Sequence, residues 1–227
     1  SKYNVSLKRI NDFLADIDFI TNGANISIDN NYFKPEIVDA EKSFIDCKDI
    51  RHPICEQINT SIEYITNDIE LGINDNDGIL LYGCNACGKS TCIKAIGINV
   101  IMAQCGYFVA SKDFKFKPYK QIFSRIFNND NIFKSQSSFA VEMSELRSIL
   151  HNVNENSLVL GDELCSGTET ISASSIVSTG LKFLSEKRCS FAFTSHLHQL
   201  HSISLMKDIK NLNIFHLKIK IENDILI

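Results

Sequence analysis

A short loop in this sequence fits a phosphate-binding pattern. Residues 83–91 read Gly-Cys-Asn-Ala-Cys-Gly-Lys-Ser-Thr, which matches G-x-x-x-x-G-K-S/T. The apolar run 79–82 precedes the loop, and apolar residues at helical spacing follow over 93–101. Because a strand, a glycine-bounded loop and a helix direct backbone N–H groups at phosphate oxygens, we predict a nucleoside triphosphate site. Lys89 would reach the β- and γ-phosphates, and Ser90 would bind Mg²⁺.

A pair of carboxylates follows a second apolar strand. Residues 157–161 read Ser-Leu-Val-Leu-Gly and lead directly into Asp162 and Glu163. Acids in this place can be ordinary solvated residues, but alongside the loop at 83–91 they favour metal and water chemistry. Asp162 would then belong to the Mg²⁺ shell, and Glu163 would orient or deprotonate the attacking water. An Asp-Glu pair favours hydrolysis of the triphosphate over transfer to an acceptor.

Polar residues in two further segments allow a functional and an ordinary interpretation. His196 follows the apolar strand 190–194, where it can contact a γ-phosphate or be an ordinary loop histidine. Ser137 and Ser138 open a helical pattern that runs over 139–149. Their hydroxyls can cap the helix, or the helix N-terminus can bind an anion. The residues alone leave both alternatives open.

The elements that position these residues alternate between strands and helices. Apolar spacing predicts helices over 5–21, 90–104, 138–152 and 172–186. Strands are expected at 44–45, 79–82, 114–117, 122–127, 158–160 and 190–194, with a hairpin over 217–227. Turn-forming residues over 22–31 should end the first helix. Since the central strands are continuously apolar, we expect an α/β fold with a mixed, mostly parallel sheet flanked by helices.

Composition narrows the class of protein. The net charge of −4 gives no overall electrostatic footprint for nucleic acid. Lys115 and Lys117 alternate with phenylalanines, so we interpret this basic stretch as the solvated face of a strand. No apolar run is long enough to cross a bilayer and no signal peptide is visible, so no membrane partner is expected. Eight cysteines without a framework spacing indicate an intracellular, reducing compartment, such as the cytoplasm or nucleus, with a virus-encoded or organellar source also open.

Several motifs together resemble the ATPase domain of the MutS mismatch-repair family. Residues 136–146 read Gln-Ser-Ser-Phe-Ala-Val-Glu-Met-Ser-Glu-Leu, and Ser-Leu-Val-Leu-x-Asp-Glu follows at 157–163. The similarity covers about residues 7 to 227. It implies a P-loop NTPase of ABC-ATPase type within a fragment of a longer protein, with residues 1–48 as the end of a lever or clamp helix and connector, and residues 49–227 as the ATPase domain. Three shorter matches keep the family's order: Arg51-His52-Pro53, Ser166-Gly167-Thr168 and Thr194-Ser195-His196.

The resemblance also implies a role for each candidate residue in hydrolysing ATP to ADP and phosphate. Glu163 matches the water-activating base, and His196 matches the switch-loop histidine. Tyr64 matches an aromatic residue that stacks on adenine, and Ser137 matches a serine that reaches the γ-phosphate of a partner subunit. Ser90 and Asp162 would hold Mg²⁺. The phosphate cradle would be formed by Gly83, Cys84, Asn85, Ala86, Cys87, Gly88, Lys89, Ser90 and Thr91.

Partners follow from the same resemblance. Composite sites imply an ATP-dependent homodimer of the ATPase domains. Mismatched DNA would bind through regions absent from this chain, and the DNA state would be coupled to the ATP state through the helix at 5–21, reciprocally in each direction.

The sequence departs from the family pattern in the loop and after the acids. Cys87 replaces a glycine of Gly-Pro-Asn-x-Gly-Gly-Lys-Ser, and a left-handed backbone there would strain the cysteine. Residues 164–167 read Leu-Cys-Ser-Gly where the family has Ile-Gly-Arg-Gly, so an arginine is replaced by Ser166. The Asn-Ala-Cys-Gly-Lys form of the loop resembles the divergent branch found in giant viruses and octocoral mitochondria.

Other protein classes fit the motifs less well. Cys84-x-x-Cys87, or His196 with His198 and His201, could belong to a redox or zinc module. However, these cysteines occupy positions whose backbone must wrap a phosphate, and no second C-x-x-C exists. A kinase that transfers phosphate to an acceptor would need an arginine-rich lid, which this sequence lacks. Another ABC-type DNA-repair or recombination ATPase would carry Leu-Ser-Gly-Gly-Gln ahead of the acids, and this string is absent as well.

Overall fold

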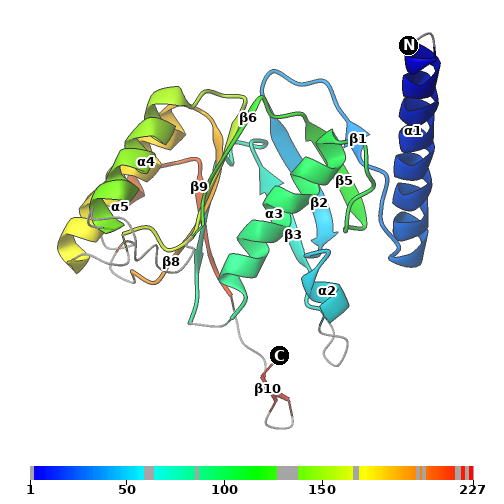
Figure 1. Cartoon of the computed structure of the whole chain (residues 1–227). Helices are drawn as coiled ribbons and strands as arrows, with labels where there is room; N and C mark the ends of the chain where they lie inside the picture. Colours follow the sequence, from blue (N-terminus) through cyan, green and yellow to red (C-terminus); the bar gives the residue numbers. More distant parts are fainter. Residues whose placement is uncertain are drawn as a thin grey trace.

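The computed structural model describes residues 3–58, 64–84, 87–126, 138–165, 169–197, 200, 203–217, 221–222 and 225–226. Within these ranges two sheets lie on either side of helix α3, and α4 and α5 cover the outer face of the larger sheet (Figure 1). The helices are α1 (Asn4–Asp29), α2 (Cys55–Ile58), α3 (Lys89–Gln104), α4 (Ser138–Asn152), α5 (Thr170–Glu186) and α6 (Ser204–Lys207).

The larger sheet is parallel throughout, with the strand order β6-β7-β8-β4-β9. Successive side chains of a strand point to opposite faces. In the central strand β4, Ile79 and Leu81 pack with α3, whereas Leu80 and Tyr82 pack with α4 and α5. Burial on both faces explains the continuously apolar strands and confirms the expected mostly parallel sheet. The strands are β4 (Gly78–Tyr82), β6 (Gln121–Arg125), β7 (Ser157–Gly161), β8 (Ser190–Ser195) and β9 (Leu212–His216).

The smaller sheet has the order β1-β5-β2-β3 and covers the other side of α3. Its strands are β1 (Glu36–Ile37), β2 (Phe44–Ile50), β3 (Asn67–Leu71) and β5 (Asp113–Lys117). In β5, Phe114 and Phe116 are fully buried while the alternate lysines are half-buried, which confirms the predicted alternation. The expected hairpin near the C-terminus is present as the antiparallel pair β10 (Ile221–Glu222) and β11 (Ile225–Leu226).

The first helix does end within the turn-forming stretch 22–31, but the predicted end at residue 21 was wrong, because α1 continues to Asp29. Tertiary packing accounts for the extension. The ring centroid of Phe19 lies 4.5 Å from that of Tyr107. A Cβ on Gly23 would come within 2.6 Å of the same tyrosine, so glycine allows the helix to lie directly against the ring. This contact outweighs the local turn preference, which is a weak determinant once packing is available.

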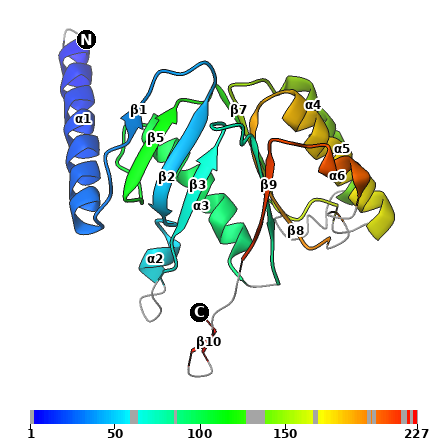
Figure 2. The ribbon, with the colours of Figure 1, turned by 180° about the vertical axis from the view of Figure 1, so that it is seen from behind.

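The apolar residues that predicted α1 do not form a buried face. Ile10 is 53% exposed and Phe13 is 63% exposed. Both views show α1 at one end of the molecule, with α4 and α5 at the other (Figures 1 and 2). Across the described ranges, no helix combines the length and the apolarity that a membrane crossing requires.

Strands β3 and β9 were not expected from the sequence. Asn67-Asp-Ile-Glu-Leu carries three polar residues in five, and Leu212-Asn-Ile-Phe-His is mixed as well. Each strand is completed by its neighbour: β3 pairs antiparallel with β2, and β9 pairs parallel with β4. The hydrogen-bonding edge offered by the more deeply buried neighbouring strand therefore specifies these elements.

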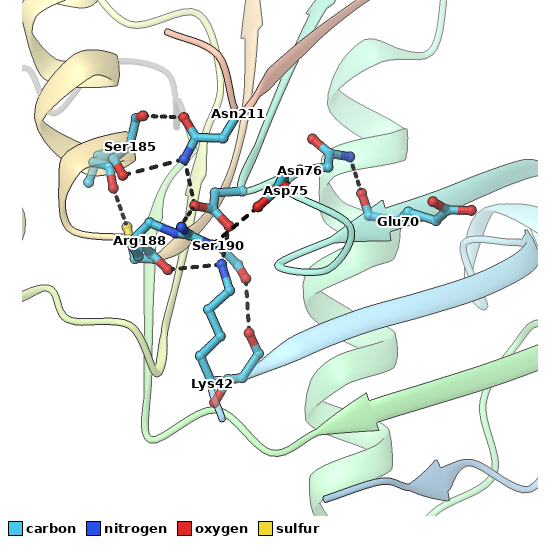
Figure 3. A network of polar contacts seen from close by, with 12 residues as sticks. Lys42, Glu70, Asp75, Asn76, Ser185, Arg188, Ser190 and Asn211 are labelled. Atoms are coloured by element: carbon cyan, nitrogen blue, oxygen red, sulfur yellow. Dashed lines mark hydrogen bonds and ion pairs between the residues drawn. The ribbon is translucent and has the colours of Figure 1, made fainter. Parts of the chain in front are cut away.

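A buried carboxylate connects the strands at the edge where β4 begins. The Asp77 side chain is fully buried, and it accepts hydrogen bonds from Lys42 Nζ, from Arg188 Nε at 2.8 Å and from Asn211 Nδ2 at 2.5 Å. Figure 3 shows these three donor residues converging from separate segments. Lys42, Arg188 and Asn211 lie just before β2, β8 and β9. One carboxylate thus joins the beginnings of four strands from both sheets.

Asp77→Ala should lower the free energy of unfolding by about 3 kcal/mol, because removing one partner of a buried ion pair leaves the other charge uncompensated. This figure is at the lower end for such a change because Lys42 and Arg188 keep some contact with water. The control is Asp75→Ala, whose side chain is 94% exposed and lies 3.8 Å from Arg188. Urea unfolding should separate the variants, and equal midpoints would contradict the role of the buried carboxylate.

Candidate functional site

Three neighbouring strands of the larger sheet bring the candidate residues to one edge. Strands β7, β8 and β4 lie side by side and run parallel, so their C-terminal ends coincide. The loop at 83–88 follows β4, Asp162 and Glu163 follow β7, and His196 follows β8. Open α/β sheets bind ligands at this edge. The topology therefore gathers residues that are more than a hundred positions apart in the chain.

Lys89 places a positive charge inside the loop. It is the first residue of α3 and is only 4% exposed. Its Nζ atom donates hydrogen bonds to the carbonyl oxygens of Gly83 and Cys84, each at 2.8 Å. The same atom lies 4.0 Å from Oε1 of Glu163. The ammonium is thus oriented by backbone dipoles, whose place the oxygens of a phosphate can take.

Two glycines and a cysteine shape the same loop. Gly88 precedes α3 with φ +91°, in the left-handed region that favours glycine. A Cβ on Gly83 would lie 2.6 Å from Sγ of Cys87, so the glycine makes room for the cysteine side chain. Cys87 is not among the described residues that have a positive φ. The strain considered for a cysteine at this position therefore does not arise.

Asp162 connects the loop helix to strand β8. Its Oδ1 atom accepts a hydrogen bond from Ser90 Oγ at 2.9 Å and another from Thr194 Oγ1 at 2.5 Å. Asp162 is 7% exposed and Thr194 is 2% exposed. The predicted pair of metal-binding residues, Ser90 and Asp162, is therefore in direct contact. Thr91 follows Ser90 in the first turn of α3.

Glu163 lies between the loop cation and the histidine. Its Oε1 is 4.0 Å from Lys89 Nζ, and its Oε2 is 4.0 Å from His196 Nδ1. The Glu163 side chain is 34% exposed, so water can reach the carboxylate. Its backbone has φ +49°, which is unusual for a residue with a Cβ. Lys89, Glu163 and His196, which the sequence predicts to take part in hydrolysis, thus lie next to one another at this edge of the sheet.

Tyr64 lies beside α3 rather than within this group of charges. The pKa of its hydroxyl is raised to about 12, mainly by burial, with nearby Cys92, Cys55 and Glu56 acting in the same direction. Cys92 is three residues beyond Lys89 on α3. The tyrosine therefore neighbours the start of the helix that carries the loop. Its role in stacking on adenine stays a prediction.

Several predicted positions lie outside the described residues. Within the described ranges, no three His, Cys, Asp or Glu side chains gather into a group suited to a metal ion, and the eight cysteines are free thiols. The alternative of a redox or zinc module gains no support from this part of the chain. The positions not described are Asn85, Ala86, Ser137, Ser166, Gly167, Thr168, His198 and His201.

Two buried side chains contact the acidic turn, and sequence reasoning gave them no role. Thr194 accepts the backbone N–H of Glu163 at 2.9 Å. Glu142, which is 3% exposed, accepts the backbone N–H of Cys165 at 2.8 Å. The available signal for Glu142 was a charged residue on the apolar face of a helix, three residues after Phe139. Thr194 carried a weaker signal, as a hydroxyl directly after the apolar residues 191–193 of the strand.

Comparison with known proteins gives a consistent set of relatives. The family described as MutS domain V matches residues 79–227. A mutS homologue of Acanthamoeba polyphaga mimivirus is 38% identical over 100% of this chain and 24% of its own length. The mitochondrial DNA mismatch repair protein mutS homologue of Sarcophyton glaucum is 40% identical over 84% of this chain and 20% of its own length. The DNA mismatch repair protein MutS of Lactobacillus gasseri is 35% identical over 94% of this chain and 25% of its own length. The chain thus spans a quarter or less of each of these relatives.

Gly88→Ala should destabilise the fold by about 1–2 kcal/mol, because the left-handed backbone conformation is unfavourable for a residue with a Cβ. Gly180→Ala is a matched control in the interior of α5, where alanine should stabilise by about 0.5–1 kcal/mol. Among the described residues no atom lies within 4 Å of the added Cβ at either position, so the backbone conformation is the difference between the two variants. Thermal unfolding measures the difference. A destabilising Gly180→Ala alongside a neutral Gly88→Ala would contradict the assigned loop conformation.

Proposed function

Since the chain belongs to the MutS family, we propose that it binds ATP with Mg²⁺ and hydrolyses it to ADP and phosphate. Relatives from a giant virus and an octocoral mitochondrion confirm both the family and its divergent branch, as the motifs predicted. One observation carries the proposed activity. Lys89, the Ser90–Asp162 pair, Glu163 and His196 meet at the C-terminal edge of three adjacent parallel strands. The fold we propose is that of a P-loop NTPase of ABC-ATPase type.

The oxygens at this edge suit Mg²⁺. The ion prefers oxygen ligands and is usually held by one or two carboxylates together with waters and substrate phosphates. Ser90 Oγ and Asp162 Oδ1 lie 2.9 Å apart, so a hydroxyl and a carboxylate are already adjacent. These two residues would hold the ion. When bound, Mg²⁺ would neutralise charge on the β- and γ-phosphates.

The remaining side chains divide the chemistry among them. Lys89 would exchange its two carbonyl hydrogen bonds for bonds to phosphate oxygens, with its charge already buried in the loop. Glu163 would orient the attacking water and accept its proton. His196, 4.0 Å from Glu163, would contact the γ-phosphate and respond to its loss. The backbone N–H groups of residues 83–91 would cradle the phosphates.

Two predicted roles concern the ends of the nucleotide. Tyr64 would stack on adenine, which its position beside the start of α3 supports. Ser137 would reach the γ-phosphate bound by a second copy of this chain. We therefore propose composite sites and an ATP-dependent homodimer.

The chain would act as one part of a MutS-like mismatch-repair protein. Residues 1–48 would be the end of a lever or clamp helix with its connector, and residues 49–227 would be the ATPase domain, although β2 runs across this division. Contacts to mismatched DNA would come from regions outside this chain. Differential binding of ATP to the DNA-bound and free states would then couple the two ligands reciprocally.

Glu163→Gln should bind Mg²⁺-ATP but lose about 10²–10⁴-fold in kcat, the usual contribution of a positioned base. The amide keeps the size of the carboxylate and removes its ability to accept a proton. Glu186→Gln, an exposed position at the end of α5, is the matched control and should keep full turnover. Phosphate release at saturating ATP measures the effect. Near-normal turnover of the Glu163 variant would remove this residue from the role of base.

The Glu163→Gln variant also tests the proposed dimer, because it holds ATP without consuming it. Sedimentation velocity with and without Mg²⁺-ATP should show a shift from monomer to dimer only when nucleotide is present. A dimer of equal strength without ATP would contradict nucleotide-dependent pairing. Failure of the unmodified chain to bind ATP would overturn the proposed function itself.

Lys89→Ala should abolish measurable nucleotide binding, because the loop loses its buried positive charge. Lys94→Ala removes the same charge from an exposed position of the same helix and should leave affinity unchanged. Equilibrium binding of a fluorescent ATP analogue compares the two. Retained affinity in the Lys89 variant, or equal losses in both, would contradict the assignment.

A further inference from the structure

The acidic turn after β7, residues 162–165, has an unusual backbone. Glu163 has φ +49° and Cys165 has φ +61°, and both positions carry a side chain. A Cβ crowds the following carbonyl oxygen in this left-handed region, so such residues are rare. They persist where the surrounding structure holds them, and they cluster at functional sites. The neighbours of this turn should therefore reveal what holds it.

Thr194 on β8 holds Glu163, the first left-handed residue of the turn. Its Oγ1 accepts the N–H of Glu163 at 2.9 Å and donates to Oδ1 of Asp162 at 2.5 Å. A hydroxyl has one proton to donate, so these two contacts have assigned directions. The side chain is 2% exposed, which shields both bonds from water. One buried hydroxyl thus places the metal-binding carboxylate and the base relative to each other.

Glu142 on α4 holds Cys165, the second left-handed residue of the turn. Its Oε1 accepts the N–H of Cys165 at 2.8 Å, and the residue is 3% exposed. Burial, together with the nearby Glu142 charge, raises the pKa of the Cys165 thiol to about 11. The thiol therefore stays neutral beside the buried carboxylate. A charged acceptor makes a stronger hydrogen bond than a neutral one, which suits a strained amide.

The strand β6 completes the attachment, because the N–H of Asp162 donates to the carbonyl oxygen of Arg125 at 2.8 Å. The turn is thus tied to β6, β8 and α4 through three backbone N–H groups. Two of the three acceptors are side chains, and these two serve the left-handed residues.

We propose that Thr194 and Glu142 are positioning residues that hold the acidic turn in its left-handed conformation and so direct the Glu163 carboxylate at the attacking water. The inference rests on the proposed ATPase function. Both residues act through backbone N–H groups of the turn, and Thr194 acts in addition through Asp162. Their loss should slow the chemical step while leaving nucleotide affinity nearly unchanged.

Amide hydrogen exchange of the unmodified chain and its variants tests the attachment without any substrate. Thr194→Val keeps the shape of the side chain and removes the acceptor, so the Glu163 amide should exchange faster. Glu142→Leu should do the same for the Cys165 amide. Thr194→Ser and Glu142→Gln keep an acceptor and should preserve protection. Exchange reports local opening, so a change confined to these amides separates loss of the attachment from general unfolding.

Turnover and binding test the consequence for catalysis. We expect kcat to fall about 10- to 100-fold in Thr194→Val and Glu142→Leu, equivalent to about 1.4–2.8 kcal/mol of activation free energy. Affinity for a non-hydrolysable ATP analogue should change by less than about threefold. In Thr194→Ser and Glu142→Gln, kcat should lie within about threefold of its value in the unmodified chain. The Glu142 pair is the more specific test of the turn, since its hydrogen bond is to Cys165 and not to Asp162.

Three results would overturn the inference. The first is faster amide exchange with unchanged kcat, which would make the contacts purely structural. The second is an equal loss of affinity and kcat in both variants, which would indicate general damage to the fold. The third is unchanged exchange at both amides. A chain that binds no ATP while its exchange pattern responds as described would instead refute the proposed function and leave the attachment itself established.

Discussion

A single carboxylate oxygen sets the geometry of the site. Oδ1 of Asp162 accepts hydrogen bonds from Ser90 on α3 and from Thr194 on β8, so three elements meet at one buried atom. Ser90 directly follows Lys89, and the histidine after β8 lies two residues beyond Thr194. The two hydroxyls therefore bring the elements that carry the loop cation and the histidine to the same place. Glu163, the next residue after Asp162, is left between them at 4.0 Å from each.

Two cysteines stand where the resemblance to the family expects glycine, and the structure accommodates them differently. Cys87 avoids a positive φ, and its Sγ occupies the space that Gly83 leaves open. Cys165 does adopt the left-handed conformation, and the buried Glu142 carboxylate accepts its N–H. Packing against Gly83 thus accommodates Cys87 in the loop. The left-handed backbone of Cys165 is instead held by a hydrogen bond to a carboxylate. The family pattern predicts strain at Cys87, whereas the left-handed backbone occurs at Cys165.

The predictable parts of this molecule are those with a local signal. The helix at 90–104 and the central strands follow from apolar periodicity, and the site follows from the phosphate loop and the paired acids. The polar strands β3 and β9 were missed because their hydrogen bonds come from β2 and β4. The extension of α1 was missed because it depends on Gly23 packing against Tyr107. Thr194 and Glu142 were missed for a related reason: each acts on the backbone of a distant turn, which no local pattern encodes.

The two edges of the parallel sheet use similar charges for opposite purposes. At the edge where strands begin, Asp77 contacts Lys42 and Arg188 directly, so its charge is neutralised within the fold. At the edge where strands end, Lys89 donates to two backbone carbonyls and lies 4.0 Å from the Glu163 carboxylate. A closer carboxylate would compete with phosphate for the ammonium. Glu163 combines this distance with a left-handed backbone, so the strained turn and a cation without a closely paired carboxylate occur together at this edge.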